Sequence, residues 1–138
     1  MTDGGLRTGS IVRFAYLWAH ERDAGRQEGL KPRRRTAVAT RFTDPGGRAW
    51  IALLPLTTRE PGPDRVAYEL SEFEVRRVGS ASADRLWVIC DELNMVAADS
   101  DRLDPDGKVG DLTLPSIRAI AKLFAASLPS AKAVKRDG

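Results

Sequence analysis

Short runs of β-branched and aromatic residues alternate with charged, turn-forming segments along this chain. The runs cover residues 11–18, 36–42, 50–54, 66–70, 85–90 and, more briefly, 93–96. This composition predicts a strand in each run. The Asp-Pro-Gly-Gly sequence at 44–47 is a strong turn signal and predicts a hairpin between the second and third strands. Leu53 and Leu54 are both apolar, so the third strand is expected to be central and covered on both faces.

Helix signals occur in two places. Ser71 and Glu74 have the spacing of a capping box, which predicts a helix of one or two turns that ends near Gly79. Pro115 suits the first position of a second helix, which Pro129 would end. Apolar residues follow Pro115 at helical spacing, at Ile117, Ile120, Ala121, Phe124 and Leu128.

The length and composition indicate one globular domain. The chain has 138 residues, of which 42% are hydrophobic and 30% charged, which is typical of a folded protein and too apolar for a disordered one. We expect a single domain over 1–138, with an ordered core at about 9–128 and a flexible basic tail at 129–138. Residues 19–35 nearly lack apolar side chains, which predicts a long exposed loop. Short antiparallel strands with a terminal helix favour a small curled β-barrel.

Several classes of site are excluded or disfavoured by composition. Cys90 is the one cysteine and His20 the one histidine, so a disulfide within the chain, a cysteine-based zinc site and a two-histidine mechanism are excluded. The aspartates between 99 and 111 lack the glutamate of a calcium loop and are better explained as turn formers. No metal or cofactor is expected. The chain has no apolar run of ~18 residues and no signal-peptide pattern, so a cytoplasmic location without membrane contact is expected.

Basic charge is concentrated in the first part of the chain. Residues 1–60 hold 11 basic and 6 acidic side chains, whereas 61–138 hold 11 and 13. Arginine, whose planar fork of donors suits phosphate oxygens, outnumbers lysine by 17 to 5. A run at 33–35, with Lys31 just before it, could hold a polyanion such as a nucleic acid. The alternatives are a solvated loop and a GC-rich genome that favours arginine codons.

An ordered set of motifs extends over residues 9–128. Its members are Gly-Ser-Ile-Val at 9–12, Gly-Arg-Gln-Glu-Gly at 25–29, Arg-Arg-Thr-Ala-Val at 34–38, Leu-Pro-Leu-Thr-Thr at 54–58, Leu-Trp-Val-Ile-Cys-Asp-Glu-Leu at 86–93 and Gly-Asp-Leu at 110–112. In this order they resemble the MazF/PemK toxins of toxin–antitoxin systems. The resemblance implies a mainly β fold with helices, namely a small SH3-like antiparallel barrel of the CcdB/MazF-like kind. It also implies a homodimer that acts as a metal-independent endoribonuclease on single-stranded RNA and is inhibited by a cognate antitoxin protein.

The resemblance also assigns site residues. The arginine of the family falls on Arg34 or Arg35, with Arg33 as a third option, and its threonine falls on Thr57. Its carboxylates fall on Asp91 and on Glu28 or, less well, Glu21. The catalytic candidates are therefore Arg34, Arg35, Thr57, Glu28 and Asp91, and the RNA-binding candidates are Lys31, Arg33, Tyr16, Trp18 and Thr58. Tyr16 and Trp18 are expected to be exposed rings that stack on bases.

This set suits RNA cleavage without histidine. The 2′-hydroxyl of RNA is the nucleophile, so the protein must accept its proton and stabilise charge on the phosphorus. An arginine fork and the Thr57 hydroxyl would donate to the phosphoryl oxygens, and Glu28 or Asp91 would accept the proton. Thr36, or an arginine of the run before it, stands where the family has proline, and Ile89 stands where some members have arginine. The alternatives are therefore an inactive SH3-like module that binds nucleic acid or protein, a protein acting on DNA or a DNA-processing enzyme, and an unrelated small β domain.

Overall fold

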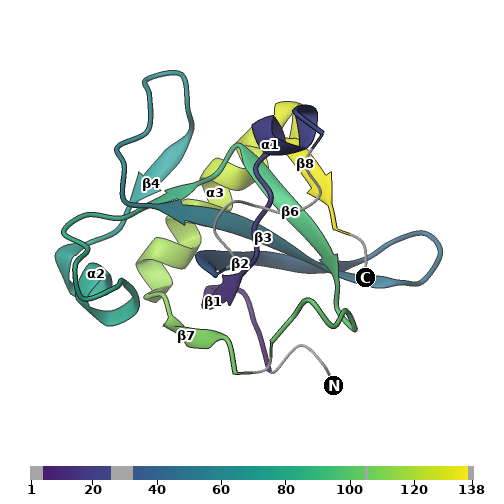
Figure 1. Cartoon of the computed structure of the whole chain (residues 1–138), viewed down its shortest axis with the longest axis horizontal. Helices are drawn as coiled ribbons and strands as arrows, with labels where there is room; N and C mark the ends of the chain where they lie inside the picture. Colours follow the sequence, from purple (N-terminus) through teal and green to yellow (C-terminus); the bar gives the residue numbers. More distant parts are fainter. Residues whose placement is uncertain (1–4, 26–32, 105, 137–138) are drawn as a thin grey trace.

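The computed structural model describes residues 5–25, 33–104 and 106–136. In chain order the elements are β1 (Ser10–Phe14), α1 (Ala19–Asp23), β2 (Arg34–Thr43), β3 (Ala49–Thr57), β4 (Ala67–Glu69), α2 (Glu72–Val78), β5 (Trp87–Ile89), β6 (Glu92–Ala97), β7 (Lys108–Asp111), α3 (Leu114–Ser127), the 3-10 turn η1 (Leu128–Ser130) and β8 (Lys132–Lys135). Figure 1 shows the long β2–β3 hairpin crossing the molecule, with the helices around it.

The strands form one branched sheet. Hydrogen bonding orders them β4-β5-β3-β2-β1-β7, and β6 joins β3 and β8 outside this path. The pairings are antiparallel except for the parallel pair β6–β8. One edge of β3 is shared, because residues 50–53 pair with β6 and residues 56–57 pair with β5. Among the described residues no pairing joins the outer strands, so the expected closed barrel is not formed, whereas the mainly β fold with mid-chain and C-terminal helices is confirmed.

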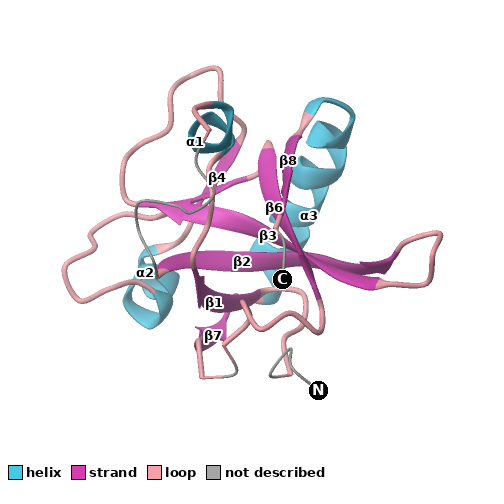
Figure 2. Cartoon of the chain, turned by 45° about the vertical axis from the view of Figure 1, so that its right-hand side comes forward, coloured by secondary structure: helices cyan, strands magenta, loops and turns pink. Residues whose placement is uncertain are grey.

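Both faces of the sheet are buried at β3. Leu54 belongs to the core beneath α2 and α3, which pack on the same face (Figure 2). Leu53 belongs to the core on the other face, which includes Val12, Val38 and Leu103. Because consecutive residues of a strand point to opposite faces, a strand covered on both sides needs apolar residues in succession. The expectation of a central third strand is confirmed, since Leu53 and Leu54 are both fully buried.

The two predicted helices form where their end signals lie. The Ser71 side chain accepts a hydrogen bond from the Glu74 amide at 3.2 Å, and α2 runs from there to Val78. α3 begins at Leu114 with proline in its first turn, and it buries Ile120 and Phe124 against the sheet. No helix in the described ranges has the length and apolar character needed to cross a membrane.

Three segments differ from the sequence expectation. The loop expected from residue 19 begins with the short helix α1, whose residue Ala19 is buried. The turn-rich acidic segment ends in β7, which pairs with β1. Where a flexible tail was expected, β8 pairs with β6 and buries Val134, and Arg136, which follows the strand, is buried as well. The Arg136 guanidinium donates to the Ala15 carbonyl and to Asn94 Oδ1, so distant partners order a segment whose own pattern is weak.

Candidate functional site

The end of the β2–β3 hairpin opposite its turn brings Arg34 and Thr57 together. β2 begins at Arg34 and β3 ends at Thr57, and the antiparallel register that pairs Thr36 with Pro55 sets the two residues opposite each other. Directly opposed residues in an antiparallel pair point to the same face. Both side chains accordingly line one hollow of about 530 Å³.

The segment around α1 forms another wall of this hollow, which we call the Arg34 hollow. Trp18, His20 and Glu21 contribute from this segment. The Trp18 amide donates to Glu21 Oε1 at 3.0 Å, a bond that turns the chain into the helix and keeps the carboxylate near Trp18. The Trp18 and His20 rings are stacked, with centroids 6.1 Å apart. Tyr16, Thr58 and Arg59 complete the lining.

The Arg34 guanidinium is anchored on two sides and still faces the hollow. Its Nη1 donates to the Leu56 carbonyl at 2.9 Å, and its central carbon lies 5.0 Å from the centroid of the Trp18 ring. Burial lowers the pKa of Arg34, and the nearby Glu21 carboxylate acts in the opposite direction. An arginine remains protonated near neutral pH, so the hollow contains a fixed cation with further N–H donors.

Thr57 supplies a hydroxyl beside that cation. Its Oγ1 accepts a hydrogen bond from the Arg59 amide at 3.1 Å. Because the oxygen serves as acceptor to the backbone, the hydroxyl proton can be donated to a group in the hollow. Arg34 and Thr57 are thus two donors, one charged and one neutral, that converge on the same space.

Arg33 and Arg35, the other arginines of the run, do not line the Arg34 hollow. Arg35 points to the face of β2 opposite Arg34, where it lines a second hollow of about 90 Å³ together with Arg33 and Ser80. Arg33 makes an exposed ion pair with Asp104 at 3.0 Å. Arg33, Arg34 and Arg35 all line the second hollow, and of the three only Arg34 also lines the hollow that contains Thr57.

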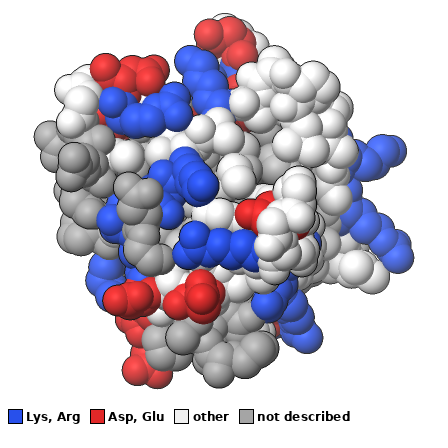
Figure 3. All heavy atoms as spheres, turned by 90° about the vertical axis from the view of Figure 1, so that its right-hand side faces the viewer, with Lys and Arg blue, Asp and Glu red and all other residues white. Residues whose placement is uncertain are grey.

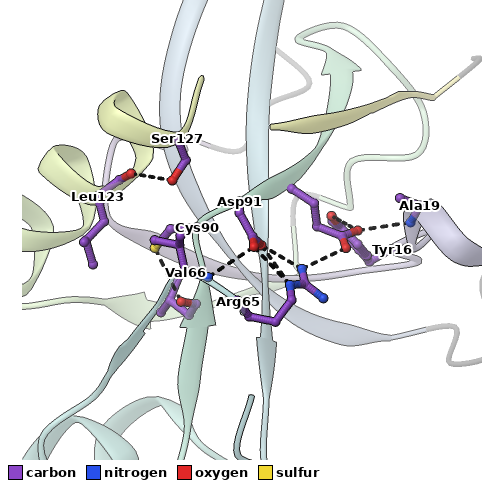
Figure 4. A network of polar contacts seen from close by, with 10 residues as sticks. Tyr16, Ala19, Arg65, Val66, Cys90, Asp91, Leu123 and Ser127 are labelled. Carbon is purple, nitrogen blue, oxygen red and sulfur yellow. Dashed lines mark hydrogen bonds and ion pairs between the residues drawn. The ribbon is translucent and has the colours of Figure 1, made fainter. Parts of the chain in front are cut away.

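Asp91 lines a neighbouring hollow of about 380 Å³ and is engaged by Arg65 (Figure 4). Arg65 Nη2 lies 2.7 Å from Asp91 Oδ1, and the Val66 amide donates to Oδ2 at 3.1 Å. Burial raises the pKa of Asp91, but the hydrogen bonds from Arg65 and Val66 outweigh it and hold the pKa below its ordinary value. Arg65 also contacts the buried carboxylate of Glu92 at 3.1 Å. His20 lines both this hollow and the Arg34 hollow, so the two adjoin.

The two aromatic candidates have different environments. Tyr16 was expected to be an exposed stacking ring, but it is only 1% exposed. Its hydroxyl donates to Glu92 Oε2 at 3.0 Å, and its pKa is raised by burial and by that carboxylate. Trp18 is half-buried and lines the Arg34 hollow, as does Thr58. Glu28 and Lys31 lie outside the described residues.

The sequence pattern indicates Glu21 only as the less favoured carboxylate and does not single out His20, Arg59 or Arg65 as site residues. The one local signal for Glu21 is its position three residues after Trp18, which is the N3 position of a capping box. That signal is weak because α1 has five residues and no apolar repeat. Arg65 lies in a loop, and its partner is 26 residues away in the chain.

No protein-family model and no curated protein matches this chain. In the described part of the chain, no group of three or more His, Cys, Asp or Glu side chains is arranged to hold a metal ion. Figure 3 shows the face at the right-hand side of Figure 1, where Lys and Arg side chains are interspersed with Asp and Glu. Basic charge alone therefore does not single out that face as a nucleic-acid interface.

Proposed function

We propose that this chain is a metal-independent endoribonuclease that cleaves single-stranded RNA in the Arg34 hollow. The observation that carries the proposal is the juxtaposition of the Arg34 guanidinium and the Thr57 hydroxyl in one hollow, with the Trp18 ring beside them. Phosphate needs charged and neutral donors, and an unpaired base stacks on an aromatic ring. An SH3-like fold of the MazF/PemK kind is part of the proposal, supported by the short antiparallel strands and the C-terminal helix.

The proposed reaction uses the substrate's own 2′-hydroxyl. Its oxygen attacks the adjacent phosphorus, and the bond to the leaving 5′-oxygen breaks, which yields a 2′,3′-cyclic phosphate and a 5′-hydroxyl. Arg34 and Thr57 donate to the phosphoryl oxygens as negative charge grows there. Glu21, the described carboxylate of this hollow, accepts the 2′-hydroxyl proton, and His20 supplies a proton to the 5′-oxygen. Asp91 takes no part in these steps, because Arg65 and Val66 already occupy its oxygens.

Cleavage of a labelled single-stranded RNA in the presence of a chelator tests this proposal. We expect fragments with cyclic phosphate ends, identified by mass spectrometry. Arg34→Gln and Thr57→Val should each slow cleavage by about 100- to 1000-fold, the usual effect of removing a donor that stabilises transition-state charge. Arg48→Gln is the matched control, because Arg48 precedes β3 at the opposite end of the hairpin. Intact RNA, or cleavage that survives Arg34→Gln, would contradict the proposal.

A module that binds RNA without cutting it is the second candidate. The observation that favours it is the engagement of Asp91, a carboxylate that the family resemblance assigns to catalysis, by Arg65. Such a module would retain single-stranded RNA in a salt-sensitive manner and leave it intact. Homodimer formation and inhibition by an antitoxin that covers the Arg34 hollow belong to the toxin proposal. Light scattering of the purified chain tests homodimer formation. Loss of RNA cleavage on adding an antitoxin peptide tests the inhibition.

A further inference from the structure

The second hollow is lined by Arg33, Arg34, Arg35, Leu56, Thr58, Ser80 and Leu86, and among the described residues no acidic side chain contributes to this lining. Arg35 lies on the face of β2 opposite Arg34, and its cross-strand partner in β1 is another arginine, Arg13. Two guanidinium groups set opposite each other on neighbouring strands repel. Burial and the charge of Arg13 both lower the pKa of Arg35.

One nitrogen of Arg35 is buried without a partner. Within the part of the chain that the structure describes, Arg35 Nε has no hydrogen-bond acceptor. The large majority of buried side-chain polar atoms in proteins have at least one hydrogen-bond partner, so an unpaired donor needs an explanation. An acceptor that carries negative charge would satisfy Nε and would reduce the repulsion between Arg35 and Arg13.

The walls of the second hollow suit an oxyanion. Thr58 and Ser80 bring hydroxyl groups, Arg33 brings a second guanidinium, and Leu56 and Leu86 form apolar sides. The volume of about 90 Å³ suits a single phosphate group better than a whole nucleotide. Arg33 also pairs with Asp104, but that pair is exposed and leaves other donors of Arg33 available.

The two hollows adjoin at the open end of the hairpin, because Arg34 and Thr58 line both. We propose that Arg35 is the centre of a second phosphate-binding subsite, which holds a backbone phosphate of the same nucleic-acid strand beside the one at Arg34. The inference rests on the proposed function for the identity of the strand. It assigns Arg34 to the scissile phosphate and Arg35 to a flanking one that is not cleaved.

Inorganic phosphate is the simplest probe of the subsite. We expect a saturable shift of the Arg35 Nε–Hε signal in arginine-selective NMR when phosphate is added. The signal of Arg48, at the other end of the hairpin, should not move. Arg35→Gln removes the assigned signal and identifies it. An Arg35 signal that does not respond to phosphate overturns the proposal whether or not the protein cleaves RNA.

An uncleavable strand tests the same subsite independently of catalysis. With a 2′-O-methyl RNA oligonucleotide, Arg35→Gln should reduce the slope of log affinity against log salt by ~0.7, the contribution of one single-strand phosphate. The same slope in Arg35→Gln and wild type contradicts the proposal. Arg48→Gln is the control for net charge and should leave the slope unchanged.

Substrate length separates the two phosphate sites. Arg35→Gln should slow cleavage of a tetranucleotide at low concentration and leave a dinucleotide, which has one phosphodiester, at the wild-type rate. Arg34→Gln should slow both. If Arg35→Gln slows cleavage of the two substrates equally, Arg35 acts at the scissile phosphate and the proposal of a separate subsite is wrong. If the wild type cleaves neither, the proposed function fails, and the phosphate and 2′-O-methyl measurements still decide the subsite.

Discussion

Arg65 forms a bidentate ion pair with the Asp91 carboxylate, in which Nη2 lies 2.7 Å from Oδ1 and Nε lies 3.0 Å from Oδ2. The contact ties the loop before β4 to the turn between β5 and β6. Bidentate charge-assisted hydrogen bonds are stronger than hydrogen bonds between neutral groups. A carboxylate that accepts them has few acceptor sites left for other donors. Asp91 is therefore a structural ion-pair partner in this fold.

Asp91→Asn should lower the free energy of unfolding and leave the rate of RNA cleavage unchanged. The ion pair is partly exposed, with side-chain exposures of 33% for Arg65 and 21% for Asp91. We therefore expect the free energy of unfolding to fall by only ~1–2 kcal/mol, measured by urea denaturation. Glu72→Gln, which breaks the exposed pair with Arg76, is the control and should change stability by less than ~0.5 kcal/mol. Unchanged stability with a 100-fold loss of RNA cleavage would instead identify Asp91 as catalytic.

Substitutions at Trp18 and Tyr16 should affect different properties, RNA affinity for Trp18 and folding stability for Tyr16. Trp18→Leu removes a ring from the Arg34 hollow and should lower RNA affinity by ~5- to 150-fold, the effect of losing ~1–3 kcal/mol of base stacking. Tyr16→Phe removes a donor to Glu92 from the buried core, so it should lower stability and leave affinity unchanged. Fluorescence anisotropy with a labelled 2′-O-methyl RNA measures the affinities. Equal losses of affinity in the two variants would show that the Trp18 ring does not stack on a base.

Glu74 should make stability depend on acid pH. Its buried carboxylate accepts from the Thr113 amide at 2.9 Å and from the Ser116 hydroxyl at 2.7 Å, which joins α2 to the start of α3. Burial raises the pKa of Glu74, but these hydrogen bonds outweigh it and leave the pKa below its ordinary value of 4.5. A carboxyl whose pKa is lower in the folded state stabilises the fold above its unfolded pKa and loses that contribution as pH falls through the folded one.

The expected result is a urea midpoint that falls as pH is lowered from about 5 toward 3. Other carboxylates with lowered pKa values contribute to the same trend, so the informative quantity is the difference between wild type and Glu74→Gln at each pH. That difference should shrink as the pH falls. A constant difference across the range would mean that the ionised form of Glu74 adds nothing to stability.

Cys90 should be inert in the folded protein. It is fully buried, and burial together with the adjacent Asp91 charge raises the pKa of its thiol to about 12. The reactive species is the thiolate, which is then scarce and shielded. A colorimetric thiol reagent should therefore label no cysteine at neutral pH and one per chain in denaturant. Rapid labelling of the native protein would show that the strand opens locally at β5.

The sequence by itself determined the elements whose signals are local. The capping spacing of Ser71 and Glu74, the repeat along α3 and the paired leucines of β3 each specify an element through neighbouring residues, so these were predicted correctly. It also restricted the candidate cation to the run at 33–35. It could not choose among the three arginines, because a one-residue shift of strand register moves every side chain to the other face.

Only the tertiary structure decided which arginine lies beside Thr57 and which arginine engages Asp91. The pairing of Thr36 with Pro55 sets Arg34 beside Thr57 and turns Arg35 away, and Arg65 engages Asp91 from a loop 26 residues distant. The tertiary structure also decided the formation of β8, which pairs with the edge of β6. In each case the stabilising partner lies far away in the chain, where local propensity and hydrophobic periodicity contain no information about it.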